Sequence, residues 1–264
     1  MYLDFVFYIL AGAGVGLAVG MTGIGGGSLM TPILVGLFGF PMHVAVGTDL
    51  LYAAVTKSSG VVAHQRKRNI NWRLVGLLAA GSIPASLATA YLLKDIFSDA
   101  ADYEPILTTA LGVMLILTSV VLIFRKRIQA SHDKPQSPSN SLKNHAGAIT
   151  LIAGIFLGIF VTLSSVGAGA FCAALLLVLY PRLSAVQVVG TDIAHAVPLT
   201  LIAGLGHFLL LGNVNWLLLS GLLIGSIPAI HFGTYLAGRL PNGMMHPILA
   251  GLLMLLGCKF AFFS

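Results

Sequence analysis

The apolar pattern of this chain is broken by Thr22-Gly23-Ile24-Gly25-Gly26-Gly27-Ser28 and again by Ser164-Ser165-Val166-Gly167-Ala168-Gly169. The apolar runs that follow these breaks, 28–40 and 170–180, are thirteen and eleven residues long. A helix needs about 20 residues to cross a hydrocarbon layer that is about 30 Å thick. We therefore predict that each break leads into a truncated helix.

The composition places the chain in a membrane. Hydrophobic residues make up 57% of it, charged residues only 8%, and its mean hydropathy is +0.96. Soluble domains carry about 25% charged residues, so a soluble enzyme, a disordered chain and a nucleic-acid binder are all poor fits. We predict an all-α polytopic membrane protein with ten apolar segments: 5–21, 28–40, 43–64, 72–93, 105–124, 147–163, 170–180, 184–210, 215–236 and 246–263.

Five motifs occur twice, in the same order and 142 to 144 residues apart. The pairs are Gly12/Gly16 with Gly154/Gly158, Gly25-x-Gly27 with Gly167-x-Gly169, Val46-Gly47-Thr48-Asp49 with Val189-Gly190-Thr191-Asp192, Asn69-Ile70-Asn71-Trp72 with Asn213-Val214-Asn215-Trp216, and Gly81-Ser82-Ile83-Pro84-Ala85 with Gly225-Ser226-Ile227-Pro228-Ala229. This duplication is typical of secondary transporters. We predict a first repeat at 1–124, a flexible, basic linker at 125–146 and a second repeat at 147–264.

The charges suggest how the two repeats are oriented. Nine of the fourteen Lys and Arg residues fall in two clusters, 66–73 and 125–143, and cytoplasmic loops concentrate such charge. The equivalent of the first basic loop, 212–215, is uncharged. We therefore expect an inverted repeat with a cytoplasmic linker. The alternative is a parallel duplication in which each glycine-broken pair crosses the membrane once. The first apolar run has an acid and no Lys or Arg before it, so we expect a membrane segment there and not a signal peptide.

The glycine breaks are predicted to bind an anion. The first amides of a helix lack intrahelical partners and carry partial positive charge, so two such ends meeting near the midplane attract anions. The alternative is tight helix packing through small residues. The candidate residues are Gly25, Gly26, Gly27 and Ser28 in the first half and Gly167, Ala168 and Gly169 in the second.

Ionisable residues within the apolar segments are the second set of candidates. Asp49 and Asp192 are repeat equivalents that we expect at similar depth, Lys57 follows Asp49, and His195 shares a helical face with Asp192. Such residues face the protein interior or water. We expect Asp49, Asp192, His195 and the repeat-related His64 and His207 to handle protons, because His titrates near neutral pH. Lys57, Thr48 and Thr191 are candidates for substrate binding. The alternative is that each Gly-Thr-Asp segment lies near the membrane surface, where Asp caps a helix.

The duplicated motifs resemble those of the TauE/SafE sulfite exporter family. The resemblance rests on Gly23-Ile24-Gly25-Gly26-Gly27-Ser28 with Pro32, on both Val-Gly-Thr-Asp motifs, on Gly60 with His64, on Gly204-x-Gly206-His207 and on both Asn-Trp motifs, and it covers the chain outside 125–146. It implies an inner-membrane secondary carrier for small anions such as sulfite, sulfonates, sulfoacetate or thiosulfate.

We accordingly expect an anion transporter that works by alternating access and is coupled to protons. The alternatives are an anion channel on the same scaffold and an intramembrane hydrolase that uses two aspartates. No nucleotide-binding loop, zinc motif or serine-hydrolase elbow occurs in the sequence, so we expect no catalytic residue, cofactor, metal ion or nucleic-acid partner. The sequence leaves the substrate, the direction of transport and the oligomeric state open.

Overall fold

The computed structural model describes residues 2–22, 27–132, 140–167, 169–237 and 245–262. These residues form ten helices and no strand, which confirms the all-α prediction. The helices are α1 Tyr2–Thr22, α2 Gly27–Gly36, α3 Met42–Arg66, α4 Trp72–Ile96, α5 Ala100–His132, α6 Asn140–Ser164, α7 Ala170–Leu179, α8 Ala185–Leu209, α9 Trp216–Ala237 and α10 Met245–Phe262.

The chain is a multi-pass membrane protein. Within the described ranges, α1, α4, α5, α6, α8 and α9 are long and apolar enough to cross a bilayer. Helix α3 matches α4 and α8 in length, at 25 residues, but it carries Asp49 and Lys57 and is less apolar. Helices α2 and α7 have only ten residues each, so neither crosses a membrane by itself.

The duplicated Asn-Trp motif starts a helix in both halves. The side chain of Asn71 accepts a hydrogen bond from the amide of Leu74 at the start of α4 (3.3 Å). The side chain of Asn215 accepts one from the amide of Leu218 at the start of α9 (3.0 Å). Each asparagine thus satisfies an amide that has no partner within its helix.

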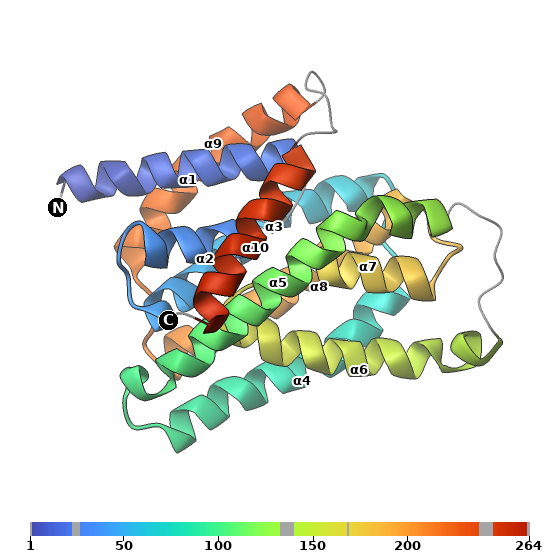
Figure 1. Ribbon diagram of the computed structural model, residues 1–264, viewed down its shortest axis with the longest axis horizontal. Coiled ribbons are helices and arrows are strands. Elements are labelled where there is room, and N and C mark those ends of the chain that lie inside the picture. The colour runs from blue at the N-terminus through green and yellow to red at the C-terminus, as the bar shows by residue number, and fades with distance from the viewer. Residues whose placement is uncertain (1, 23–26, 133–139, 168, 238–244, 263–264) are drawn as a thin grey trace.

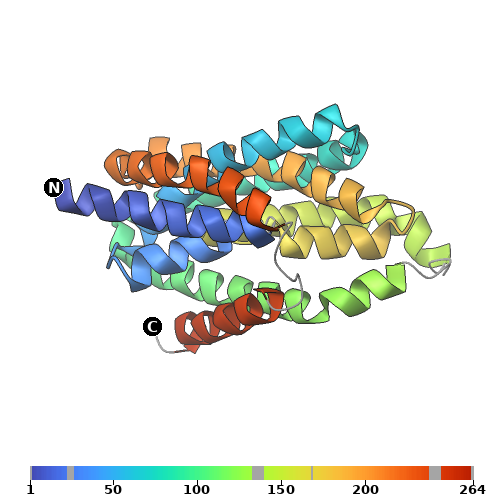
Figure 2. The same ribbon diagram turned by 90° about the horizontal axis from the view of Figure 1, so that it is seen from above.

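Each short helix folds back along the helix before it. The ring of Tyr8 in α1 lies 5.8 Å from the rings of both Phe38 and Phe40, which follow α2. In the other half, the Thr150 hydroxyl in α6 lies 2.8 Å from that of Tyr180, which follows α7. The end of each short helix therefore returns to the start of its partner. Figures 1 and 2 show α2 near the N-terminal end of the molecule and α7 toward the opposite end.

The contacts of the glycines show the relative directions of the paired helices. Successive glycines of α1 face successive turns of α9, and glycines of α6 face α4 in the same way, so both pairs run parallel. The contacts are Gly12 with Leu222, Gly16 with Ser226, Gly20 with Ile230, Gly154 with Leu78 and Gly158 with Ser82. Helices α3 and α8 run antiparallel, because Leu51 packs on Gly204 while Gly60 packs on Ile193.

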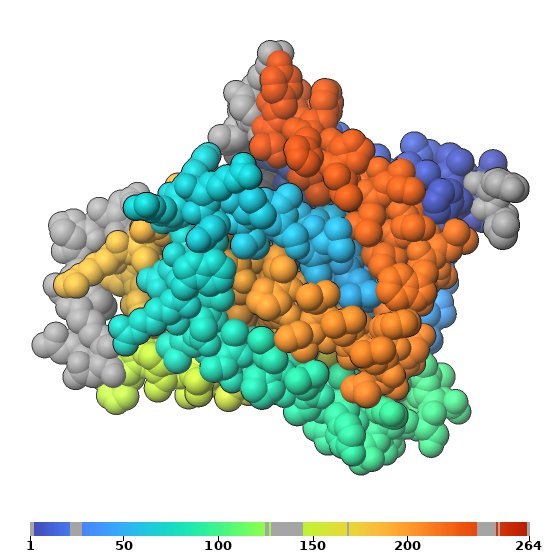
Figure 3. All heavy atoms as spheres, turned by 180° about the vertical axis from the view of Figure 1, so that it is seen from behind, coloured from blue at the N-terminus to red at the C-terminus, as the bar shows by residue number. Residues whose placement is uncertain are grey.

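The two halves are interleaved. Helix α1 packs on α9, α4 on α6, α3 on α8 and α5 on α10, so every long helix of one half contacts the other half. Helices α5 and α10 cross on the face nearest the viewer in Figure 1, and α3, α4, α8 and α9 gather on the opposite face in Figure 3. The start of α1 and the end of α10 lie toward one end of the molecule.

The predicted linker at 125–146 is shorter in the structure than in the sequence pattern. Helix α5 continues to His132 and α6 begins at Asn140, and residues 133–139 lie outside the described residues. Residues 125–132 and 140–146 of the predicted linker thus belong to α5 and α6.

We predict that Gly12→Ala destabilises the protein while Gly14→Ala does not. A Cβ at Gly12 would collide with the backbone of Leu222, with its Cα only 2.8 Å away, whereas a Cβ at Gly14 meets nothing within 4 Å. Overpacking of this kind costs about 1–3 kcal/mol. Thermal unfolding of the two variants in detergent tests this, and equal melting temperatures would contradict the proposed packing.

Candidate functional site

The antiparallel crossing of α3 and α8 holds most of the ionisable residues that the sequence singled out. Asp49 and His195 are fully buried, and Asp192 is 5% exposed. Both aspartates lie inside their helices, since α3 begins at Met42 and α8 at Ala185. The alternative that they cap helices at the membrane surface is therefore wrong.

Asp49 lies among hydroxyl groups. Thr31 in α2 donates a hydrogen bond to its Oδ2 oxygen (2.6 Å). The Ser165 hydroxyl, from the second glycine break, lies beside the same carboxylate. The Oδ1 oxygen of Asp49 and the hydroxyl oxygen of Ser165 have no hydrogen bond of ordinary geometry to any described residue. The first half's aspartate thus faces the second half's break.

Asp192 lies among different groups. The Cys172 thiol, in the first turn of α7, is within hydrogen-bonding reach of its carboxylate, and Lys57 of α3 is its principal charged neighbour. The charge of Lys57 also acts on His195 and, more weakly than on Asp192, on Asp49. Lys57 therefore stands between the two aspartates and closer to Asp192.

We had expected the two aspartates to lie at similar depth, but they lie at different levels along the crossing of α3 and α8. Asp192 is next to Ile193, which packs on Gly60, and Gly60 lies eleven residues after Asp49 on α3. At 1.5 Å per residue, the backbone of Asp192 lies level with a point about 16 Å along α3 from Asp49. Because the helices are antiparallel, equivalent residues lie on opposite sides of the crossing and not at one level.

Two further pairs of polar residues line this region, and each residue of one pair is the repeat equivalent of a residue of the other pair. The Ser82 hydroxyl lies 2.8 Å from Nε2 of His195. In the other half, the Ser226 hydroxyl lies beside that of Tyr52. Sequence analysis missed Tyr52, although it aligns with His195 at the same offset of 143 residues as the aspartates. It also missed Thr31, Cys172 and Ser165, because only the fold brings them to the aspartates.

Thr48 and Thr191 have structural partners. The Thr48 hydroxyl accepts a hydrogen bond from the amide of Asn215 (3.1 Å), and that of Thr191 accepts one from the amide of Asn71 (3.0 Å). Each threonine thus holds the turn before a helix of the other half. This arrangement favours a packing role for the two hydroxyls over the predicted role in substrate binding.

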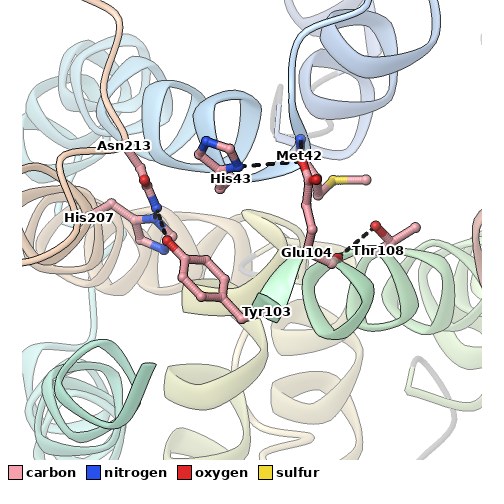
Figure 4. A network of polar contacts seen from close by, with 7 residues as sticks. All are labelled: Met42, His43, Tyr103, Glu104, Thr108, His207 and Asn213. Carbon is pink, nitrogen blue, oxygen red and sulfur yellow. Dashed lines mark hydrogen bonds and ion pairs between the residues drawn. The ribbon is translucent and has the colours of Figure 1, made fainter. Parts of the chain in front are cut away.

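His207 lies in a separate network near the end of α8 (Figure 4). Its Nε2 is 2.9 Å from the carbonyl oxygen of Thr162, and Asn213 links it to the Tyr103 hydroxyl (3.5 and 2.7 Å). Twelve residues, about 18 Å of helix, separate it from His195.

His43 and Glu104 lie nearby in the same view, 3.4 Å apart. His64, the equivalent of His207, lies near the C-terminal end of α3, with Nδ1 against the position of Gly190. Among the described residues, neither His64 nor His207 hydrogen-bonds to an aspartate, although His64 lies beside Gly190, two residues before Asp192.

The glycine breaks are described in part. Gly25, Gly26 and Ala168 lie outside the described residues. Gly27 begins α2, Ser28 is buried in its first turn, and Gly169 directly precedes α7. Gly167 has φ +114°, so its backbone conformation requires glycine. Across the described ranges, no three His, Cys, Asp or Glu side chains lie close enough together to hold a metal ion.

Comparisons with known proteins agree on one class. The sequence profile of the family described as "Sulfite exporter TauE/SafE" matches residues 8–260. The chain is 37% identical to the probable membrane transporter protein YjnA of Bacillus subtilis, over 96% of this chain and 98% of the relative. It is 29% identical to YdhB of the same bacterium, over 91% and 96%, and 28% identical to MJ0441 of Methanocaldococcus jannaschii, over 84% and 81%; both carry the same description. No solved structure matches it significantly.

We predict that Thr191→Val lowers the stability of the protein by about 1 kcal/mol, because the partly buried backbone amide of Asn71 loses its acceptor. Thr118→Val is the matched control, since the Thr118 hydroxyl is buried without a hydrogen bond to any described residue. Thermal unfolding measures both effects. A larger loss for the control would show that the hydroxyl of Thr191 does not hold the turn.

Proposed function

The chain belongs to the TauE/SafE sulfite exporter family and is a membrane transporter, and we propose that it carries small, sulfur-containing anions by alternating access. Sulfite, sulfonates, sulfoacetate and thiosulfate form the expected class. The family name and the positive groups at the centre of the fold support this choice.

One observation carries the proposal: Lys57 lies within electrostatic reach of the first turn of α7. The Lys57 charge acts on Cys172, the third residue of that helix. The amides of a first helical turn carry partial positive charge and bind anions. An ammonium group and a helix N-terminus therefore converge on one place inside the membrane domain. Asp192 balances the ammonium when no anion is bound, and we infer that the anion competes with Asp192 for Lys57.

Alternating access is supported by the helix directions. The contacts of α1 with α9 are matched by those of α6 with α4, and α3 crosses its counterpart α8 antiparallel. We infer an inverted repeat in which each half contributes one folded-back hairpin, α1–α2 or α6–α7. In transporters of this design, one repeat rocks against the other around a central site.

Proton coupling is supported by Asp192 and His195. They lie one helical turn apart on α8, both buried and both within reach of the charge of Lys57. A proton taken up by either group changes the charge balance around Lys57 and hence the affinity for an anion. We propose that this pair couples anion movement to proton movement.

The orientation follows from the charged ends of the helices. Arg66, Lys67, Arg68 and Arg73 lie at the α3–α4 turn. The α4–α5 turn at the opposite end carries Asp95, Asp99 and Asp102. We propose that the basic end faces the cytoplasm in the cell membrane, with the segment between α5 and α6 on the same side.

The separation of the aspartates argues against a hydrolase. Two carboxylates share a catalytic proton only when they are close together, and the backbone of Asp192 lies level with a point about 16 Å along α3 from Asp49. An anion channel on the same scaffold is distinguished by flux that does not saturate and by the absence of exchange between labelled and unlabelled anion.

We predict that Lys57→Gln lowers anion flux by about ten- to a hundredfold, which corresponds to the loss of a hydrogen bond to a charged group. Flux into proteoliposomes is measured with a panel of sulfite, sulfate, thiosulfate, sulfoacetate, taurine and simple carboxylates. Lys94→Gln, an exposed lysine at the end of α4, is the control. Wild-type flux in the Lys57 variant would contradict the proposed site.

We predict that an imposed pH gradient accelerates wild-type flux and that Asp192→Asn abolishes this response. The amide keeps the shape of the carboxyl group but cannot take up a proton. Asp99→Asn, at the exposed α4–α5 turn, should respond as the wild type does. An unchanged response in Asp192→Asn would remove the coupling role of this residue.

We predict that a membrane-impermeant maleimide labels Asp99→Cys but not Arg68→Cys in intact cells. Both positions are exposed at turns, and the native Cys172 is buried. The unmodified chain gives the background from Cys172 and Cys258. The reverse labelling pattern would invert the proposed orientation.

A further inference from the structure

Asp49 differs from its repeat equivalent in the kind of atoms around it. Asp192 has a thiol and an ammonium group as neighbours, whereas Asp49 has the hydroxyls of Thr31 and Ser165. Tyr52 lies one turn further along α3, and its hydroxyl is also buried. The first aspartate is thus surrounded by oxygen from α2, from α3 and from the segment that follows α6.

Two of these oxygens have unused capacity. The Tyr52 hydroxyl faces Ser226, whereas the Oδ1 oxygen of Asp49 and the Ser165 hydroxyl lie beside one another without a hydrogen bond of ordinary geometry to any described residue, and neither residue is more than 3% exposed. Buried polar atoms are nearly always satisfied, so these unsatisfied oxygens in one place indicate a bound ligand. A buried carboxylate in particular requires a compensating charge.

Lys57 does not supply that charge in full, because its principal partner is Asp192. The end of α6 favours a cation as well. This helix ends at Ser164, next to Ser165, and the last carbonyls of a helix lack partners and carry partial negative charge. Ser165 has φ +58°, a left-handed conformation that is uncommon outside glycine. Residues held in such conformations cluster at ligand sites.

We propose that Asp49, Thr31 and Ser165 bind a sodium ion between α2, α3 and the end of α6. Sodium is a hard cation and prefers oxygen ligands, which all three residues offer. One carboxylate neutralises one monovalent ion, whereas divalent ions are usually held by several carboxylates. Transporters with interrupted helices coordinate coupling ions through helix C-terminal ends and unwound backbone. The site joins residues of both halves, so sodium binding opposes their separation. The sodium site itself does not depend on the proposed transport function. The role of sodium as a coupling ion rests on that function.

Thermal unfolding of the purified chain in detergent tests the site, starting from a sodium-free N-methyl-D-glucamine buffer. Sodium chloride should raise the melting temperature in a saturable way, because a ligand that binds only the folded state stabilises it. Potassium chloride and choline chloride at the same ionic strength should not. Asp49→Asn should lose the response, Thr31→Val and Ser165→Ala should require several times more sodium, and Asp99→Asn, at the exposed α4–α5 turn, should keep it.

Several outcomes would overturn the proposal. They are an equal rise with potassium or choline, a sodium response that survives Asp49→Asn, and stabilisation by acid alone with no response to sodium, which would mean that the carboxyl group holds a proton. If Asp49→Asn does not fold, unchanged sodium affinity in both Thr31→Val and Ser165→Ala overturns it.

Anion flux is measured separately on the same variants. A sodium response without anion flux contradicts only the transport function, and anion flux without a sodium response contradicts only the sodium site.

Discussion

The charged side chains of α3 and α8 must be kept away from lipid, and the rest of the structure depends on how this is done. An isolated charge at the bilayer centre costs about 2.5–3.5 kcal/mol on insertion scales. Here the two helices cross closely, because Gly204 and Gly60 let side chains of the opposite helix approach the backbone. Lys57 lies within electrostatic reach of both Asp192 and Asp49 inside the crossing and acts mainly on Asp192. The remaining helices of both halves pack around α3 and α8.

The interruptions before α2 and α7 follow from the same constraint. Unpaired backbone groups are tolerated at membrane depth only when protein or water surrounds them. Each short helix folds back beside the helix before it, and its first turns meet an aspartate of its own half: Thr31 contacts Asp49 and Cys172 contacts Asp192. The first turns of both short helices are thereby placed where the charged residues already are. Substrate and coupling ions would meet both kinds of group together.

The duplication is symmetric in backbone and asymmetric in chemistry. Equivalent glycines, threonines and asparagines make equivalent contacts in both halves. Lys57, however, aligns with Thr200, and Tyr52 aligns with His195. Helix α3 therefore carries the ammonium group of Lys57 and the hydroxyl group of Tyr52, and α8 carries the imidazole of His195. This difference is the basis for assigning the anion and proton roles near Lys57 and α7, and the sodium site near Asp49.

The sequence alone determined the membrane class, the ten helices, the two truncated segments and the identity of most buried charges, because these depend on local hydropathy, on glycine and on repeated spacing. It did not anticipate that the hydroxyls of Thr48 and Thr191 accept backbone hydrogen bonds from the other half, or that His207 contacts the carbonyl oxygen of Thr162. It gave no signal for Thr31 or Ser165, because neither lies near Asp49 in the chain. Only the tertiary structure decided these contacts: an antiparallel crossing places equivalent residues on opposite sides of the centre, and the fold brings Ser165 of the second glycine break to Asp49, more than a hundred positions away.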